Sequence, residues 1–425
     1  MSKGNILAGI DLGSSKISTI IAQVASDPVS LERDVNIVGV SSVESRGIKK
    51  GQIVDIEEAV EATIESVEGA ERMAGYNLDN AYVSVGGANV SSQNSHGVVA
   101  VSDSNGEIVE SDIDRVIEAA SAVSLPSSRE LLHVLPREYV VDGESGIKDP
   151  VGMSGIRLEV QTHLITASGA SIKNIKKSIN EVGINIVELI YTGIASSQSV
   201  LTKTEKELGC ALIEIGGGTT SVTVYVEGGI DSSFVLPIGA KNVTNDLAIG
   251  LRLSLETAEK IKIALSKEQK KKKVKGDEKE DEFDLKSLGV EDPKRISKKT
   301  LAEGIIKPRL NEIFTMVRIQ LERENLATRI PSGAIITGGG AETIGITEAA
   351  KRTLSLPVRV GVPKGVGGLI DDIINPQYAC PVGLILYGAS RETFQVSSGG
   401  LSKKFKLPTK GIAAKLIETI KDLLP

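Results

Sequence analysis

Three short glycine-rich stretches each follow an apolar run, and each carries groups that can bind a phosphate. They are Asp11-Leu-Gly-Ser-Ser-Lys16, Glu214-Ile-Gly-Gly-Gly-Thr-Thr220 and Gly338-Gly-Gly-Ala341. A phosphate needs many short N–H contacts with no side chain in the way; glycine permits that approach, and Ser and Thr add hydroxyl donors. One such loop alone is more typical of a tight turn. Three in this order, each closing an apolar run, predict a nucleotide site.

The loop residues suggest a division of roles. Asp11 and Glu214 are the candidate catalytic carboxylates, and Asp11 is placed to hold Mg²⁺ through water, because Mg²⁺ tends to keep its hydration shell. Lys16 can offset phosphate charge. The predicted nucleotide-binding residues of the loops are Gly13, Ser14, Ser15, Lys16, Gly216, Gly217, Gly218, Thr219, Thr220, Gly338, Gly339, Gly340 and Ala341. The chain has neither a Gly-x-x-x-x-Gly-Lys-Ser/Thr nor a Gly-x-Gly-x-x-Gly pattern.

The elements that must position these loops form the same pattern twice. Around the first loop, apolar runs predict three strands, at Ile6–Ile10, Ile17–Val24 and Val35–Val43, and then a helix, Ile56–Met73, that ends at Gly75. Around the second loop they predict strands at Ala211–Ile215, Ser221–Val226 and Asp231–Ile238, and helices near Lys241–Leu251 and Leu255–Leu265. The two acids lie 214 − 11 = 203 positions apart. This separation predicts a duplicated α/β domain with the nucleotide between the halves, and excludes a short-period repeat.

Two stretches interrupt this pattern. Residues 81–160 contain strand-like pieces and one helix, Ser111–Val123, with a predicted capping box from Ser111 to Asp114. Residues 266–299 contain the basic run Lys270–Lys273 and the acidic run Asp277–Asp281, and they predict a solvated loop. The strands and helix of residues 81–160 therefore predict an inserted α+β subdomain.

The composition limits the classes of partner. The chain has 425 residues, 40% hydrophobic, with a formal net charge of −6, 3% aromatic residues and no Trp. An acidic chain that is poor in aromatic residues is a weak candidate for nucleic-acid binding, so none is expected. Cys210 and Cys380 are predicted to be buried, since they form neither a metal nor a disulfide pattern. No signal peptide or membrane span is evident, which predicts a cytoplasmic protein.

Longer motifs carry a family resemblance over about residues 4–389. The order of the three loops resembles the actin, sugar-kinase and DnaK superfamily. The chain resembles the FtsA family of bacterial actin-like division proteins more closely, on the motifs Ile10–Lys16, Val83-Ser-Val-Gly-Gly-Ala88, Gly193-Ile-Ala-Ser-Ser-Gln-Ser-Val-Leu201, Ala302-Glu-Gly-Ile-Ile-Lys-Pro-Arg309 and Ile335–Ala341. The resemblance implies an actin-like ATPase fold of two duplicated ribonuclease-H-like halves.

The resemblance also implies how the domains divide. The first actin-like domain takes residues 1–80, 161–200 and 360–395, with the inserted subdomain at 81–160. The second takes residues 201–240 and 311–359, with a small subdomain at 241–310. A linker at 396–410 leads to a helix at 411–425.

Further roles are implied by the same resemblance. ATP and Mg²⁺ are the expected cofactors, Gly339–Ala341 the adenosine loop, and Glu259 and Lys262 the residues that border ribose and base. Arg309 falls in a segment that resembles the family's site for the C-terminal peptide of FtsZ. The other expected partners are further copies of the chain in a polymer, and later division proteins.

Departures from the superfamily pattern favour binding over rapid turnover. Glu214 stands where Asp is usual, Ser221 where many relatives have Asp, and Ala195–Ser197 where related ATPases often orient water. Phosphoryl transfer needs a positioned nucleophile as well as a metal, so at most slow ATP hydrolysis is expected. Two alternatives remain open: a PilM-type pilus-assembly ATPase and a small-molecule kinase of the same superfamily.

The last residues predict a membrane anchor. In Gly411–Leu424, one helical face gathers Ile412, Leu416, Ile417, Ile420, Leu423 and Leu424, and the preceding segment from Lys403 to Lys410 is basic. Such a helix can lie in the membrane interface, with nearby lysines attracted to anionic lipid. The expected location is the cytoplasmic side of the cell membrane, peripheral, at the division site. The alternative is that this face packs on the protein itself.

Overall fold

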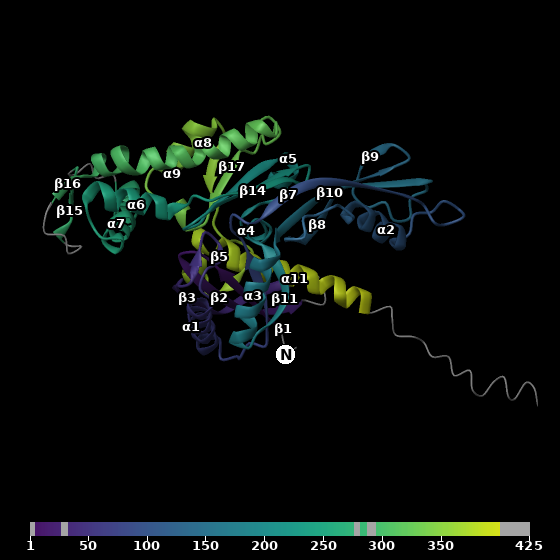
Figure 1. Cartoon of the computed structure of the whole chain (residues 1–425), viewed down its shortest axis with the longest axis horizontal. Coiled ribbons are helices and arrows are strands. Elements are labelled where there is room, and N and C mark those ends of the chain that lie inside the picture. The colour runs from purple at the N-terminus through teal and green to yellow at the C-terminus, as the bar shows by residue number, and fades with distance from the viewer. Residues whose placement is uncertain (1–4, 27–32, 276–280, 287–294, 400–425) are drawn as a thin grey trace, which may run out of the picture.

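The computed structural model describes residues 5–26, 33–275, 281–286 and 295–399. The predicted terminal helix at 411–425, its six apolar residues and most of the linker lie outside these residues. Two mixed sheets, each with helices, form the centre of the molecule, and a third sheet extends to one side (Figure 1).

The first half is a six-stranded sheet in the order β11-β6-β1-β2-β3-β19. Its strands are β1 (Asn5–Leu12), β2 (Lys16–Ser26), β3 (Arg33–Glu44), β6 (Asn80–Val85), β11 (Asn185–Tyr191) and β19 (Gly367–Gly368). Its helices are α1 (Ile56–Ala74), α3 (Gly169–Val182), α4 (Thr192–Val200), α10 (Ile370–Ile373), η4 (Pro376–Tyr378) and α11 (Ala379–Gly399). α11 packs against α4 and β1, so the C-terminal part of the described chain returns to the first half.

The second half repeats this design with a five-stranded sheet in the order β14-β13-β12-β17-β18. The strands are β12 (Cys210–Ile215), β13 (Thr220–Val226), β14 (Gly229–Leu236), β17 (Ala334–Thr337) and β18 (Val358–Val360). The helices are α5 (Lys203–Leu208), α6 (Ala240–Leu251), α7 (Leu255–Lys275), η2 (Thr300–Ile306), α8 (Lys307–Arg323), η3 (Gly339–Glu342) and α9 (Ile346–Leu354). The hairpin β15 (Glu282–Asp284) and β16 (Arg295–Ser297) lies at the far end of this half (Figure 1).

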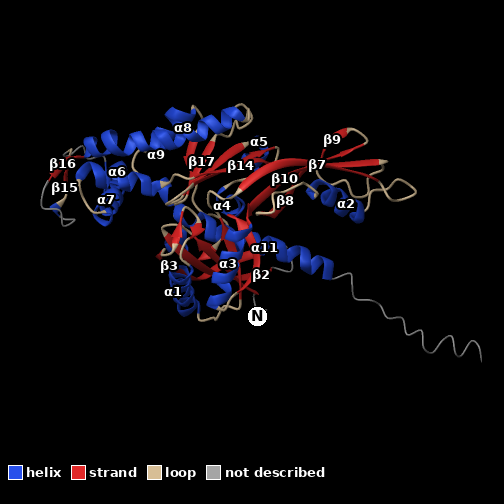
Figure 2. Cartoon of the chain, in the orientation of Figure 1, coloured by secondary structure: helices blue, strands red, loops and turns tan. Residues whose placement is uncertain are grey.

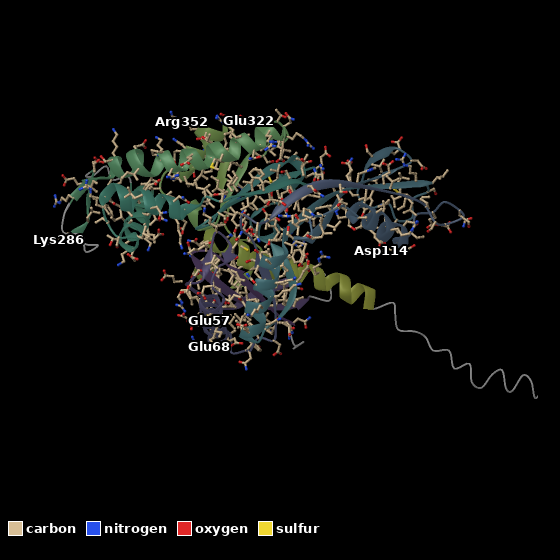
Figure 3. All side chains as sticks on the ribbon, in the orientation of Figure 1. Glu57, Glu68, Asp114, Lys286, Glu322 and Arg352 are labelled. Atoms are coloured by element: carbon tan, nitrogen blue, oxygen red, sulfur yellow. The ribbon has the colours of Figure 1, made fainter. Side chains whose placement is uncertain are left out.

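The strand directions confirm the predicted duplication. In each half three antiparallel strands, β1-β2-β3 and β12-β13-β14, continue into two parallel ones, β6-β11 and β17-β18. The strands that flank the first two glycine loops, β1, β2, β12 and β13, are mostly buried because helices cover the sheets. Charged side chains lie on the outer helix faces, as Figure 3 shows for Glu57 and Glu68 on α1 and for Glu322 on α8.

A third, antiparallel sheet in the order β7-β10-β8-β9 forms the insertion. It comprises β7 (Ser91–Ala100), β8 (Arg129–Val141), β9 (Glu144–Ile147) and β10 (Arg157–Ser168), with α2 (Glu110–Ser121) against it (Figure 2). The predicted start at residue 81 falls inside β6, a strand of the first half, and the predicted end at 160 falls inside β10. The shift arises because the apolar run Tyr82–Val85 has the same pattern whichever sheet it joins.

Two local expectations were wrong. α2 begins at Glu110, and the carboxylate of Asp112, not a side chain at Ser111, accepts a hydrogen bond from the Val109 N–H at 3.1 Å. The predicted loop from residue 266 is helical as far as Lys275 in α7, where Lys298 pairs with Glu268. Long charged side chains are good helix formers, so composition alone does not separate a solvated helix from a loop. The predicted end of α1 is confirmed, with Gly75 in the left-handed conformation at φ 72°.

Candidate functional site

The first two glycine loops are equivalent four-residue turns that contact each other across the two halves. Residues 13–16 join β1 to β2, and residues 216–219 join β12 to β13. A Cβ placed on Gly217 would lie 1.9 Å from Ser15 Oγ, and one on Gly218 would lie 3.1 Å from Ser14 Oγ. The structure therefore brings the predicted phosphate loops together, and the second loop needs glycine at these positions.

A small hairpin forms a third wall beside the loops. β4 (Ile48–Lys49) and β5 (Gln52–Ile53) are joined by Lys50 and Gly51, both with positive φ. The Gly51 N–H donates to Ser14 Oγ at 2.8 Å, and Lys50 Cα lies 3.0 Å from where a Gly218 Cβ would stand. The sequence did not predict this hairpin. Its one signal is the Lys-Gly turn between two very short apolar runs.

Asp11 lies near the end of β1, half-buried behind the first loop. Ser84 of β6 donates to Asp11 Oδ1 at 2.7 Å and accepts from the Leu12 N–H at 3.0 Å. Burial raises the pKa of Asp11, and the Ser84 hydroxyl opposes the rise. Ser84 is a second residue that was missed: its motif was noted for the family resemblance, but no side-chain role was assigned.

Lys16 is the cation of the first loop. Its ammonium lies 3.8 Å from the centre of the Tyr378 ring and, among the described residues, is buried without a hydrogen-bond partner. Burial lowers the pKa of Lys16 to about 8, against the opposing charges of Asp11 and Glu342. A buried ammonium with unused donors matches what a phosphate ligand requires.

Glu214 holds the position of Asp11 in the second half but has a different environment. Its Oε2 is buried without a partner among the described residues. Burial, followed by the charge of Asp11, raises the pKa of Glu214 to about 8, which disfavours its ionised form. Further buried hydroxyls without partners in the described part of the chain belong to Tyr191, Thr192, Ser196 and Thr223.

The third loop packs on the second. Cβ atoms on Gly338 and Gly340 would come within 2.6 and 2.4 Å of Ile215, so both glycines are required by the packing against β12. The nearest atom to a Cβ on Gly339 is Gln377 Cβ at 3.9 Å, which leaves this position open. Ala341 is buried in η3. The structure therefore joins all three loops into one region.

Two predicted hydroxyl or cation donors are already engaged inside the second half. The Thr220 hydroxyl donates to the Ile238 carbonyl at 2.9 Å, so it holds β13 to the chain before α6. Lys262 forms an ion pair with Glu259 at 2.7 Å and donates to Thr244 Oγ1 at 2.9 Å. Burial lowers the pKa of Lys262. Glu259 and Lys262 thus lie together on α7 and face α6. Their role at the ribose and base of a nucleotide stays a prediction.

Arg309 is not a free anchor. Its guanidinium binds both carboxylate oxygens of Asp246, at 2.6 and 2.8 Å, and also pairs with Glu312. These hydrogen bonds, chiefly those to Asp246, raise the pKa of Arg309 further. The expected bidentate contact to an acidic peptide is therefore already made within the chain, because α6 brings a carboxylate 63 positions away against α8.

The residues present fit a nucleotide with Mg²⁺. Glycines form a cradle that any Cβ would fill, Lys16 offers unused donors, and Asp11 lies at the same edge of the paired sheets. Both cysteines are buried and free, as predicted. Among the helices that the structure describes, none has the length and apolar character needed to cross a membrane.

These paired sheets and facing hairpin turns define a protein of the actin-like ATPase fold. Over 90% of the chain, the structure resembles that titled "PilM-PilN type IV pilus biogenesis complex", covering 98% of that chain with a TM-score of 0.62 at 15% identity. It also resembles MreB5 of Spiroplasma citri bound to AMPPNP over 93% of this chain and 99% of the other, with a TM-score of 0.53 at 14% identity. At these identities the likeness concerns the fold alone.

Sequence comparisons give the family. A family model described as "SHS2 domain inserted in FTSA" matches residues 87–166, and one described as "Cell division protein FtsA" matches residues 211–383. The chain is 37% identical to cell division protein FtsA of Pseudomonas aeruginosa over 92% of its length and 91% of the relative's. It is 36% identical to that of Borreliella burgdorferi, over 96% and 97%.

The chain belongs to the FtsA family of cell division proteins. This membership confirms the predicted family, the actin-like fold and the inserted subdomain. It favours a division protein over the pilus-assembly and kinase alternatives, since relatives of the chain over nearly its whole length carry the FtsA description.

Proposed function

We propose that this chain binds ATP with Mg²⁺ between its two halves. The observation that carries the proposal is the pair of hairpin turns in contact, with the buried, unpartnered ammonium of Lys16 beside them. Bound Mg²⁺ would neutralise phosphate charge. Asp11 would hold its water shell, and backbone N–H groups of residues 13–16 and 216–219 would bind phosphate oxygens.

Calorimetry with ATP in the presence of Mg²⁺ tests this directly. Replacing Lys16 by Met removes the unused donors and keeps much of the contact with Tyr378, so ATP affinity should fall about tenfold or more. Lys203→Met, an exposed lysine of α5 outside the loops, is the matched control. Unchanged affinity in Lys16→Met would remove Lys16 from the site.

We infer that hydrolysis is slow. Burial raises the pKa of Glu214 to about 8 and so disfavours the ionised carboxylate that would accept a proton from attacking water. A turnover near the ordinary enzyme range, on the order of 10 per second, would contradict this inference.

The proposed cellular role is a polymer that tethers FtsZ filaments to the cytoplasmic membrane at the division site and helps recruit later division proteins. Family membership supports the role in division, and the basic segment with the apolar face at 403–424 supports the anchor. Liposome sedimentation compares the full chain with the Leu416→Glu, Ile420→Glu variant. Equal lipid binding by both would refute the anchor.

The small subdomain at 241–310 is the proposed site for the FtsZ C-terminal peptide. Apolar side chains there are exposed, with Ile249 at 77% and Leu255 at 53%, so this subdomain offers apolar surface to a peptide. Ile249→Glu should weaken peptide binding by fluorescence anisotropy, because it places a charge on this surface. Arg309→Glu should act through loss of the Asp246 contact. If both variants bind the peptide as the wild type does, the site lies elsewhere.

A further inference from the structure

The first turn of α6 is attached to the second phosphate loop. The Ala240 N–H donates to the Gly216 carbonyl at 2.8 Å, and the Lys241 N–H donates to the Gly217 carbonyl at 2.9 Å. Gly239 packs so closely on the loop that a Cβ would lie 2.6 Å from the Gly216 oxygen. Any movement of this loop therefore carries the Lys241 backbone with it.

The Lys241 side chain reaches across to the first half. Its ammonium donates to the main-chain carbonyl of Ser14, in the first phosphate loop, at 2.7 Å. Lys241 is exposed on its other side, where it lines a cavity of about 550 Å³ together with Arg46, Lys49, Asp55 and Glu58. One flexible cation thus connects the two phosphate loops, and the partner that the described part of the chain gives its tip is the neutral carbonyl of Ser14.

A phosphate group is a stronger partner for this ammonium than a carbonyl. The Ser14 carbonyl is a neutral acceptor, whereas a phosphate oxygen is an anion, so Coulomb attraction to the ammonium adds to the hydrogen bond. The lysine side chain has a flexible four-carbon stem, and its ammonium has three N–H donors. The ammonium can therefore change partner without movement of α6. Because its present partner, Ser14, belongs to the loop that faces Gly217, a phosphate between the loops would lie within its reach.

We propose that Lys241 is a cross-domain clamp that holds the two phosphate loops together through the Ser14 carbonyl and turns onto the outermost phosphate of a bound nucleotide. The clamp makes Lys241 a specificity-determining residue, which favours a nucleoside triphosphate over a diphosphate. This inference rests on the proposed nucleotide function. It adds a residue that no glycine-loop pattern contains.

Two measurements on the full chain test the clamp. Calorimetry with Mg²⁺ and ATP, ADP or AMP compares the wild type with Lys241→Met, Lys241→Arg and, as the matched control from the same cavity, Lys49→Met. Lys241→Met should lower ATP affinity about tenfold, ADP affinity less than about threefold and AMP affinity not at all. Lys241→Arg should keep most of the preference for ATP, and Lys49→Met all of it.

Amide hydrogen exchange without nucleotide is the second measurement. Residues 13–16 should exchange faster in Lys241→Met than in the wild type, since the contact between the halves is lost. An equal loss of affinity for all three nucleotides, or the same preference in Lys241→Met as in the wild type, would overturn the specificity role. Unchanged exchange would overturn the contact. A wild type that binds no nucleotide defeats the proposed function, and the exchange experiment still decides whether the clamp exists.

Discussion

The two halves share one design but differ in what they place at the turn. Aligning the turns pairs Asp11 with Glu214, and residues 13–16 with 216–219. The first turn reads Gly-Ser-Ser-Lys and the second Gly-Gly-Gly-Thr. The hydroxyls of the first turn lie where side chains on the second would stand. The two turns can therefore contact each other because the second has glycine where the first has serine.

The acids differ in a similar way. Asp11 accepts a hydrogen bond from Ser84, whereas Glu214 Oε2 has no partner among the described residues and its pKa is raised to about 8. The longer Glu side chain extends into a buried group of hydroxyls, and burial disfavours its charge. At the turns, the first half therefore supplies the charged side chains of Asp11 and Lys16, and the second supplies the main chain of Gly216–Gly218.

The largest effect is expected from a side chain on the bare turn. Gly217→Val places a Cβ at 1.9 Å from Ser15 Oγ and should force the halves apart, with a loss of about 100-fold or more in ATP affinity by calorimetry. Gly304→Ala in η2, outside the three loops, is the control, because nothing lies within 4 Å of a Cβ at that position. Affinity in Gly217→Val within about twofold of the wild type would show that the loops need not approach each other.

Exchanging the acids for amides is expected to have a smaller effect. Asp11→Asn should reduce the Mg²⁺ dependence of ATP binding about tenfold, because it removes the carboxylate charge. Glu214→Gln should change it less than about threefold, since burial already disfavours the charge of the Glu214 carboxyl. The measurement is ATP affinity with and without Mg²⁺. If both variants lose the same share of the Mg²⁺ dependence of ATP affinity, the two acids have equivalent roles, which contradicts the proposed difference between the halves.

The inserted sheet of the first half should make stability depend on pH. His163 is buried between Asn94 and Ser233 of β14, and burial lowers its pKa from 6.5 to about 3. The unfolded state then binds more protons between these values. Stability is present above pH 6.5 and falls as the pH drops below it, by up to about 1.4 kcal/mol per unit for this group.

Thermal unfolding between pH 7 and pH 5 measures this slope. His163→Gln removes the titrating imidazole and keeps an amide between Asn94 and Ser233. The Tm of this variant should therefore fall less on acidification than that of the wild type. Identical slopes in wild type and His163→Gln would place the acid sensitivity elsewhere, with the buried His133, pKa about 4, the next candidate.

The smallest effect concerns the small subdomain of the second half. Arg309 and Asp246 are each about 25% exposed, so solvent weakens their ion pair. A double-mutant cycle of Arg309→Met and Asp246→Asn, followed by chemical denaturation, should give a coupling of about 0.5–1 kcal/mol. No coupling would return Arg309 to the role of a free peptide anchor.

The sequence by itself determined the repeated strand-turn-strand pattern, the three loops and the end of α1 at Gly75. These features depend on local periodicity and on glycine, both of which can be read from neighbouring residues. It did not separate β6 from the insertion, since an apolar run does not specify which sheet it joins. It did not give the start of α2 either, since several acidic residues near residue 111 could cap the helix.

Only the tertiary structure decided which side chains complete the site. Ser84 bonds Asp11 from 73 positions away, and Lys241 reaches Ser14 from 227. The same holds for the raised pKa of Glu214 and for the engagement of Arg309 by Asp246. Burial and ion pairing depend on what the fold brings close, and the type of a residue does not specify its distant neighbours.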